Sequence, residues 1–192
     1  MDRAAEAAQR GGRTEASVAR PRTGRPAWPL FLGLALVVFV VDQLTKAAVA
    51  AALAPGESVS VVGDLVRLVH GRNTGALFGL FRDQATLFAV VSIGVIALIV
   101  WYHRRAGRSA VLSVALGLLL GGALGNLTDR VRLGYVLDFV DAGIGDLRWY
   151  TFNVADAAIS TAILLLLVVG LRPSVAGVGE RAGGRPGPEA DG

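Results

Sequence analysis

The chain has 192 residues, 53% of them hydrophobic, and carries a formal net charge of +4 at pH 7. Its mean hydropathy of +0.55 exceeds that of a typical soluble domain, so most of the chain is expected to lie in a membrane. Because it contains no cysteine, a disulfide framework, a thiol nucleophile and a thiolate metal site are all excluded.

The positive charge is concentrated outside the apolar segments. Arginines precede the first apolar segment, lie between the second and third, and follow the fourth. This is the positive-inside pattern of a membrane protein, so we expect no nucleic-acid partner. The two histidines, His70 and His103, are far apart, and no metal-ligand spacing occurs. We therefore expect no metal.

Four apolar segments are long enough to cross a bilayer as helices: residues 28–53, 84–102, 110–126 and 152–171. The Arg-rich residues 1–27 and the Gly- and Pro-rich residues 173–192 predict disordered tails on either side of one membrane domain, residues 28–172. A cleaved signal peptide is the alternative for the N-terminus. The first apolar segment is longer than a signal-peptide core of roughly 7 to 15 residues, which favours a retained helix.

The arginine distribution places both termini in the cytoplasm and the loops 54–83 and 127–151 outside. In the first loop, β-branched runs at 58–62 and 65–69 flank Gly63-Asp64, which predicts a hairpin. Residues 147–150 suggest a further strand. Glycines at four-residue spacing in the third apolar segment predict close helix packing. The expected fold is a membrane all-α, four-transmembrane-helix bundle with a small extracytoplasmic β-hairpin or sheet.

Polar side chains interrupt or border the apolar segments in four places, although a charge at the bilayer centre costs at least ~3 kcal/mol. Asp42 and Lys46 are four residues apart on one helix face, in the outer half of the first segment. They are expected to form an internal salt bridge or to contact substrate directly. The other positions are Asn73 and Gly75 after the hairpin, Asn126, Asp129 and Arg130 at the end of the third segment, and Asp138, Asn153 and Asp156 near the fourth.

All these positions fall on the outer side of the membrane, so their side chains can converge. Carboxyl groups gathered in a low-dielectric pocket cannot all ionise, and two of them can share a proton. Such a pair is the basis of aspartic-protease chemistry. For Asp129, an ion pair with Arg130 is favoured, and Arg130 is also expected to meet a lipid phosphate. The spacing alone leaves four candidates for the pair: Asp129, Asp138, Asp141 and Asp156.

Several motifs resemble those of the lipoprotein signal peptidases, also called signal peptidase II, over residues 30–171. Their order along four apolar segments makes the combination specific. The motifs are Val41-Asp42-Gln43-Leu44-Thr45-Lys46, Arg72-Asn73-Thr74-Gly75-Ala76, Gly125-Asn126-Leu127-Thr128-Asp129-Arg130, Val136-Leu137-Asp138-Phe139 and Phe152-Asn153-Val154-Ala155-Asp156.

The resemblance implies a bacterial inner-membrane aspartic endopeptidase that uses no cofactor. Such an enzyme removes the signal peptide from diacylglyceryl-modified prolipoproteins, cleaving immediately before the lipidated cysteine. By position, the resemblance implies that Asp138 and Asp156 are the catalytic pair. It places Asn73, Asn126, Arg130 and Asn153 in pocket positions, and Asp42, Lys46 and Asp129 in positions that support the site. We expect membrane phospholipids as surroundings and a monomeric enzyme, because one chain supplies both acids.

Two other functional classes are considered from the residues. Intramembrane acids also serve proton-coupled transporters, but these would have polar residues spread through the membrane depth rather than gathered outside. A non-catalytic lipid-binding or assembly protein would use the acids only in structural ion pairs. A serine peptidase is disfavoured because neither histidine is placed to activate a serine.

Overall fold

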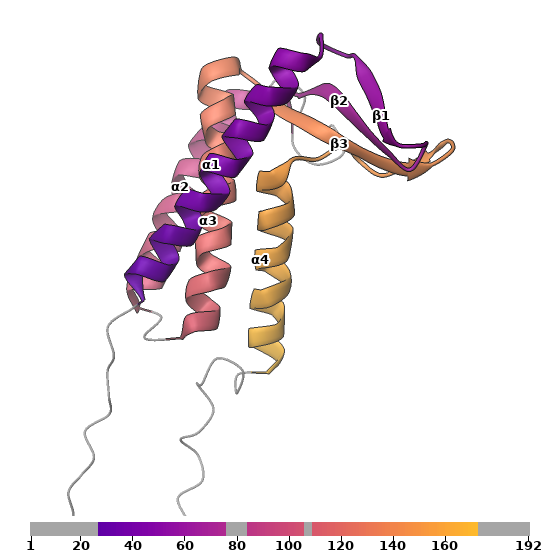
Figure 1. The fold of residues 1–192 in the computed structure, drawn as a ribbon. Coiled ribbons are helices and arrows are strands. Elements are labelled where there is room, and N and C mark those ends of the chain that lie inside the picture. The colour runs from indigo at the N-terminus through magenta and orange to yellow at the C-terminus, as the bar shows by residue number, and fades with distance from the viewer. Residues whose placement is uncertain (1–26, 76–83, 106–108, 173–192) are drawn as a thin grey trace, which may run out of the picture.

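The computed structural model describes residues 27–75, 84–105 and 109–172. Apart from Ala27, the predicted tails lie outside these residues. Four helices, α1 (Trp28–Ala52), α2 (Ala85–Arg105), α3 (Ala110–Leu133) and α4 (Val154–Leu171), are each long and apolar enough to cross a membrane. Beyond one end of the helices lies an antiparallel sheet of four strands in the order β1 (Ser58–Val62), β2 (Val66–Asn73), β3 (Val136–Ile144) and β4 (Leu147–Arg148) (Figure 1). The predicted four-helix membrane fold with a small sheet is confirmed.

Helix α3 is the centre of the bundle, because α1, α2 and α4 all pack against it. Its glycines allow this on two sides. A Cβ atom at Gly121 would lie 2.6 Å from the carbonyl oxygen of Ala35 in α1, and one at Gly122 would lie 2.6 Å from that of Ala155 in α4. Only a residue without a side chain permits such close backbone approach, as the spacing of small residues predicts.

Three predicted helix boundaries differ from the structure by two residues or more. Helix α2 ends at Arg105 rather than at residue 102. Helix α3 continues past Asn126 to Leu133 and ends at Gly134, which has φ 78°, the left-handed conformation that glycine favours at a helix end. The apolar run ends earlier because the last two turns emerge from the apolar region and carry polar side chains. Helix α4 begins at Val154, with Asn153 as its N-cap.

The hairpin of β1 and β2 is confirmed, but β3 was not predicted. Strand β3 pairs antiparallel with β2, and Gly71 lies opposite Asp138. Its first four residues are buried, so the sequence lacks the alternation of a half-exposed strand. At Gly71, a Cβ atom would lie 2.8 Å from the backbone oxygen of Asp138, so glycine is needed for the two strands to meet.

The C-terminal end of α1 fixes the sheet over the bundle. Val49 of α1 packs with Leu137 and Phe139 of β3 in one buried cluster. In addition, the Nδ1 atom of His70 in β2 lies 2.8 Å from the backbone oxygen of Leu53, at hydrogen-bond distance. These contacts hold β3, and with it Asp138, above the helix ends.

Candidate active site

Asp138 lies in β3 with 2% of its surface exposed. Its Oδ1 atom accepts a hydrogen bond from Nδ2 of Asn153 at 2.7 Å, and its Oδ2 atom accepts one from Nδ2 of Asn73 at 3.0 Å. Asn73 ends β2 and Asn153 precedes α4, so a strand and a helix both orient this carboxyl group.

Asp156 lies in the first turn of α4. Its Oδ1 atom accepts a hydrogen bond from Nδ2 of Asn126 at 2.9 Å, and its Oδ2 atom accepts one from the backbone N–H of Asn153 at 3.2 Å. The Oδ1 atom of Asn153 accepts in return from the backbone N–H of Asp156 at 2.9 Å. This reciprocal capping box fixes the start of α4 and the Asp156 side chain together.

The two acids influence each other electrostatically. Burial, followed by the charge of Asp156, raises the pKa of Asp138 to about 7, against the hydrogen bonds from Asn73 and Asn153. Burial and the neighbouring acid therefore favour the protonated form of this carboxyl group over a wider pH range than for an exposed aspartate. A pair of acids of this kind can supply one protonated and one ionised group.

Lys46 is the centre of a buried charge cluster below the two acids. Its Nζ atom lies 2.8 Å from Oδ2 of Asp42 and 2.8 Å from Oδ2 of Asp129, and it donates to Oδ1 of Asn126 at 3.2 Å. The Asp42–Lys46 pair is the salt bridge that the spacing predicts. The preference for an Asp129–Arg130 pair is wrong, because adjacent residues of a helix point in different directions and α1 brings Lys46 to Asp129.

The two carboxylates of this cluster also hold backbone groups of the elements above. Oδ1 of Asp42 accepts from the backbone N–H of Ala155 at 3.0 Å, and Oδ2 of Asp129 accepts from that of Leu137 at 3.1 Å. Ala155 and Leu137 each immediately precede one of the two acids of the site. The cluster thereby positions β3 and the start of α4 relative to each other.

Gln43 belongs to this cluster, and the sequence analysis did not single it out. Its Nε2 atom donates to Oδ2 of Asp42 at 3.2 Å and to Oδ1 of Asp129 at 3.1 Å. The available signal was a polar residue next to Asp42 inside an apolar segment. Gly125 completes the packing, since a Cβ atom there would collide with the Asp42 carboxylate.

Arg130 ties the segment after β2 to the helices. Its Nη1 atom donates to the backbone oxygen of Asn126 at 3.3 Å, and its Nη2 atom donates to that of Gly75 at 3.4 Å. The backbone N–H of Gly75 in turn donates to Oδ1 of Asn73 at 3.1 Å. The guanidinium also lies 5.6 Å from the ring centroid of Phe88 in α2. Its predicted contact with a lipid phosphate stays a prediction.

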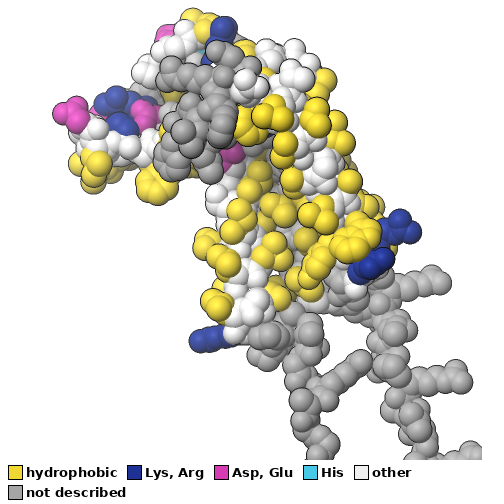
Figure 2. Space-filling model, turned by 180° about the vertical axis from the view of Figure 1, so that it is seen from behind, with side chains coloured by type: hydrophobic (Ala, Val, Ile, Leu, Met, Phe, Trp, Pro, Cys, Tyr) yellow, Lys and Arg dark blue, Asp and Glu magenta, His cyan; other side chains and the backbone are white. Residues whose placement is uncertain are grey.

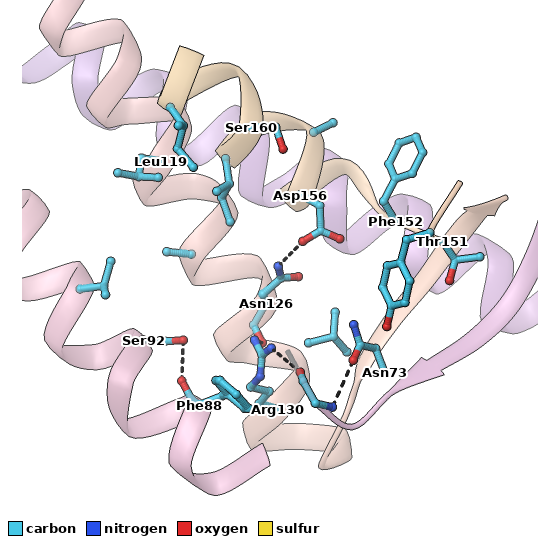
Figure 3. A pocket seen from close by; sticks show the side chains of 18 of the residues that line it. Asn73, Phe88, Ser92, Leu119, Asn126, Arg130, Thr151, Phe152, Asp156 and Ser160 are labelled. Atoms are coloured by element: carbon cyan, nitrogen blue, oxygen red, sulfur yellow. Dashed lines mark hydrogen bonds between the residues drawn. The ribbon is translucent and has the colours of Figure 1, made fainter. Parts of the chain in front are cut away.

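A cavity of about 770 Å³ extends from the polar site between α2 and α4, along α3 (Figure 3). One end is polar, with Asp156, Asn126 and Asn73. The rest is mainly apolar, and its lining includes Val91, Val95, Leu119, Ile159 and Ile163. Such a space fits a long apolar group that ends in a polar one.

The four candidate carboxyl groups have different partners. Asp129 pairs with Lys46, and Asp141 pairs with Arg148 at 2.9 Å on the sheet. Within the part of the chain that the structure describes, no ion pair involves Asp138 or Asp156. Of the four candidates, these two are therefore the acids that no ion pair occupies, and such acids are the better suited to proton transfer.

Comparisons with known proteins agree with one another. A family model described as "Signal peptidase (SPase) II" matches residues 34–172. A lipoprotein signal peptidase of Pelotomaculum thermopropionicum is 46% identical over 138 residues, covering 71% of this chain and 88% of that protein. One of Pseudomonas aeruginosa is 42% identical over 152 residues, covering 76% and 88%. A solved structure of a bacterial membrane enzyme is similar with a TM-score of 0.74 and 28% identity, covering 84% of this chain and 99% of that one.

Proposed function

Because this chain belongs to the signal peptidase II family, we propose that Asp138 and Asp156 are the two carboxyl groups with which it cleaves its substrate. The protein is a membrane peptidase that processes prolipoproteins. Its substrate is a precursor that carries a diacylglyceryl group, and cleavage falls immediately before the modified cysteine.

The pair acts as a shared acid and base. The ionised carboxyl group takes a proton from a water molecule as the water oxygen attacks the scissile carbonyl carbon, while the protonated carboxyl group donates a hydrogen bond to the carbonyl oxygen. The tetrahedral intermediate then collapses. Its C–N bond breaks, a proton passes to the leaving nitrogen, and the products are a new amino terminus and a carboxylate on the signal peptide.

The observation that carries this proposal is the double contact of Asn153. Its side-chain amide donates to Asp138 at 2.7 Å, and its backbone N–H donates to Asp156 at 3.2 Å. Hydrogen bonds from one residue thus fix the positions of both carboxyl groups relative to each other. Paired acid–base chemistry needs this preorganisation.

The cavity supports a membrane route for the substrate. Its apolar walls on α2 and α4 suit acyl chains or an apolar peptide segment, and Asp156 lies at its polar end. The site lies on the extracytoplasmic side, with both termini cytoplasmic. In support, the helix ends opposite the sheet carry the basic residues Arg104, Arg105 and Arg172 (Figure 2). A single chain supplies every residue of the site, so the enzyme acts as a monomer.

The test uses purified protein in lipid with a diacylglyceryl-modified prolipoprotein. We expect Asp138→Asn and Asp156→Asn each to reduce cleavage by several orders of magnitude while the protein stays folded. Asp146→Asn, an exposed acid in the turn between β3 and β4, is the matched control and is expected to cleave normally. Undiminished cleavage by either folded site variant would remove that residue from the pair, and undiminished cleavage by both would favour a structural role for the acids.

A further inference from the structure

The face of α4 that lines the cavity changes from polar to apolar with depth. Asp156, Ser160 and Ile163 all belong to the lining, and they are four and then three residues apart. Side chains at these spacings lie one above the other on a helix face. Helix α4 begins beside the sheet and runs away from it (Figure 1), so Ser160 lies one turn deeper in the bundle than Asp156. Figure 3 shows these two residues on successive turns of α4.

Helix α3 has the same gradient on its side of the cavity. Arg130 and Asn126 lie toward its C-terminal end, which leads into β3, whereas Ala123 and Leu119 lie further from the sheet. A ligand in the cavity therefore meets charged and amide groups at one end and hydrocarbon at the other. Among the α4 residues of the lining, only Ser160 carries a hydroxyl group, and it lies at the change from one to the other.

The Ser160 hydroxyl differs from the other hydroxyl groups of the helices. Beyond the first turn of a helix, a serine or threonine hydroxyl can donate to the backbone carbonyl four residues earlier. Five do so in the described helices: those of Thr45, Ser92, Ser113, Thr128 and Thr161. The Ser160 hydroxyl makes no hydrogen bond to any described residue, although its neighbour Thr161 does, and its side chain is exposed.

An O–H group among apolar side chains is favourable only where an acceptor meets it. The adjacent lining residues Ile159 and Ile163 have side chains that supply none. The Ser160 hydroxyl is therefore placed to donate to an acceptor that a ligand brings. An ester carbonyl of an acylated glycerol is such an acceptor, because it lies between the polar and the hydrocarbon parts of the lipid and has no proton of its own to donate.

We propose that the Ser160 hydroxyl donates a hydrogen bond to an ester carbonyl of the diacylglyceryl group, and that the enzyme thereby prefers ester-linked to ether-linked lipid. The inference rests on the proposed function, which puts the scissile bond at Asp156. One helical turn separates Asp156 from Ser160, a rise of ~6 Å at 1.5 Å per residue. The sulfur and glycerol carbons between the modified cysteine and its ester groups can span this step. The acyl chains then continue along Ile163.

The test compares two synthetic lipopeptides that differ only in the lipid linkage. Both carry one signal-peptide sequence and a glyceryl-modified cysteine, with two ester-linked acyl chains in one and two ether-linked alkyl chains of equal length in the other. The ether keeps the hydrocarbon but lacks the carbonyl acceptor. We expect the unmodified site to bind the ester lipopeptide about fivefold more tightly. Ser160→Ala should bind both equally, because it loses affinity for the ester alone.

Dissociation constants are measured in phospholipid nanodiscs with Asp138→Asn present in every protein, which prevents cleavage. The KM values for cleavage, measured without that substitution, should give the same ratio. Ser92→Ala is the matched control. Ser92 also lines the cavity, but its hydroxyl already donates to the backbone oxygen of Phe88 at 2.7 Å, so this variant should keep the full ester preference. Alanine favours helix more than serine does, and both variants are expected to fold.

Three results would overturn the inference alone. The first is an ester preference that survives in Ser160→Ala, and the second is the lack of any preference in the unmodified site. The third is an equal loss of affinity for both lipopeptides in Ser160→Ala, which would show that the side chain only fills space. Failure to bind either lipopeptide would instead overturn the proposed substrate, and this inference with it.

Discussion

Asn153 and Asp138 are joined by a hydrogen bond of 2.7 Å from the Asn153 amide to the Asp138 carboxyl group. The residue that caps α4 therefore also orients the acid of β3. This couples the stability of a helix terminus to the geometry of the site, and the two effects can be separated by substitution.

At Asn153, serine and alanine variants should differ in stability but not in activity. Serine preserves the N-cap hydrogen bond, whereas alanine loses it at a cost of about 1 kcal/mol. Both lose the amide that donates to Asp138, so we expect a large fall in kcat for each. Thermal unfolding in detergent measures the first effect and prolipoprotein cleavage the second. Normal cleavage by Asn153→Ser would contradict the orienting role of the amide.

The activity should decline as the pH rises above neutrality. Because the pKa of Asp138 is raised to about 7, the acid pair keeps its shared proton below that pH and loses it above. The hydrogen bond from Asn73 stabilises the ionised form of Asp138, so Asn73→Leu should raise this pKa further and move the alkaline limb to higher pH. The profile of kcat/KM against pH measures the shift.

A matched control for this experiment is Arg72→Leu, one residue earlier on β2. The Arg72 guanidinium lies over the ring of Tyr135, 5.1 Å from its centroid, and makes no contact with the acids among the described residues. Its alkaline limb should coincide with that of the unmodified protein. A downward shift for Asn73→Leu would contradict the proposed effect of the hydrogen bond.

Lys46→Met should destabilise the protein by about 3–5 kcal/mol, because it leaves two carboxylates buried without their cation. Adding Asp129→Asn removes one of the two carboxylates that Lys46→Met leaves without a cation. The double variant should therefore be less destabilised than the sum of the two single variants. Denaturant unfolding in mixed micelles gives all three values, and strict additivity would show that Lys46 and Asp129 do not interact.

Filling the cavity should weaken substrate binding. Ser160 lines it, whereas the next residue, Thr161, lies outside the lining. We expect Ser160→Phe to raise KM about tenfold, equivalent to about 1.4 kcal/mol, with an unchanged pH profile. Thr161→Phe is the control and should leave KM unaltered. Equal KM values for the two variants would mean that the substrate does not occupy this part of the cavity.

Much of the architecture could be predicted from the sequence. Apolar segments of membrane-spanning length identified four helices, and small residues at four-residue spacing predicted the close packing of α3. The Asp42–Lys46 pair was also accessible, because residues four apart on a helix are neighbours whatever the rest of the chain does. The family resemblance supplied the assignment of Asp138 and Asp156, which spacing could not make.

Contacts between elements were decided only by the tertiary structure. The partner of Asp129 is Lys46 of α1, 83 positions away in the numbering, rather than its neighbour Arg130. Strand β3 escaped prediction because burial of its first residues removed the alternation on which such predictions depend. Local patterns determine which residues share a face of one helix or strand. Which faces meet depends on packing, and packing assembled Asn73, Asn126 and Asn153 around the two acids.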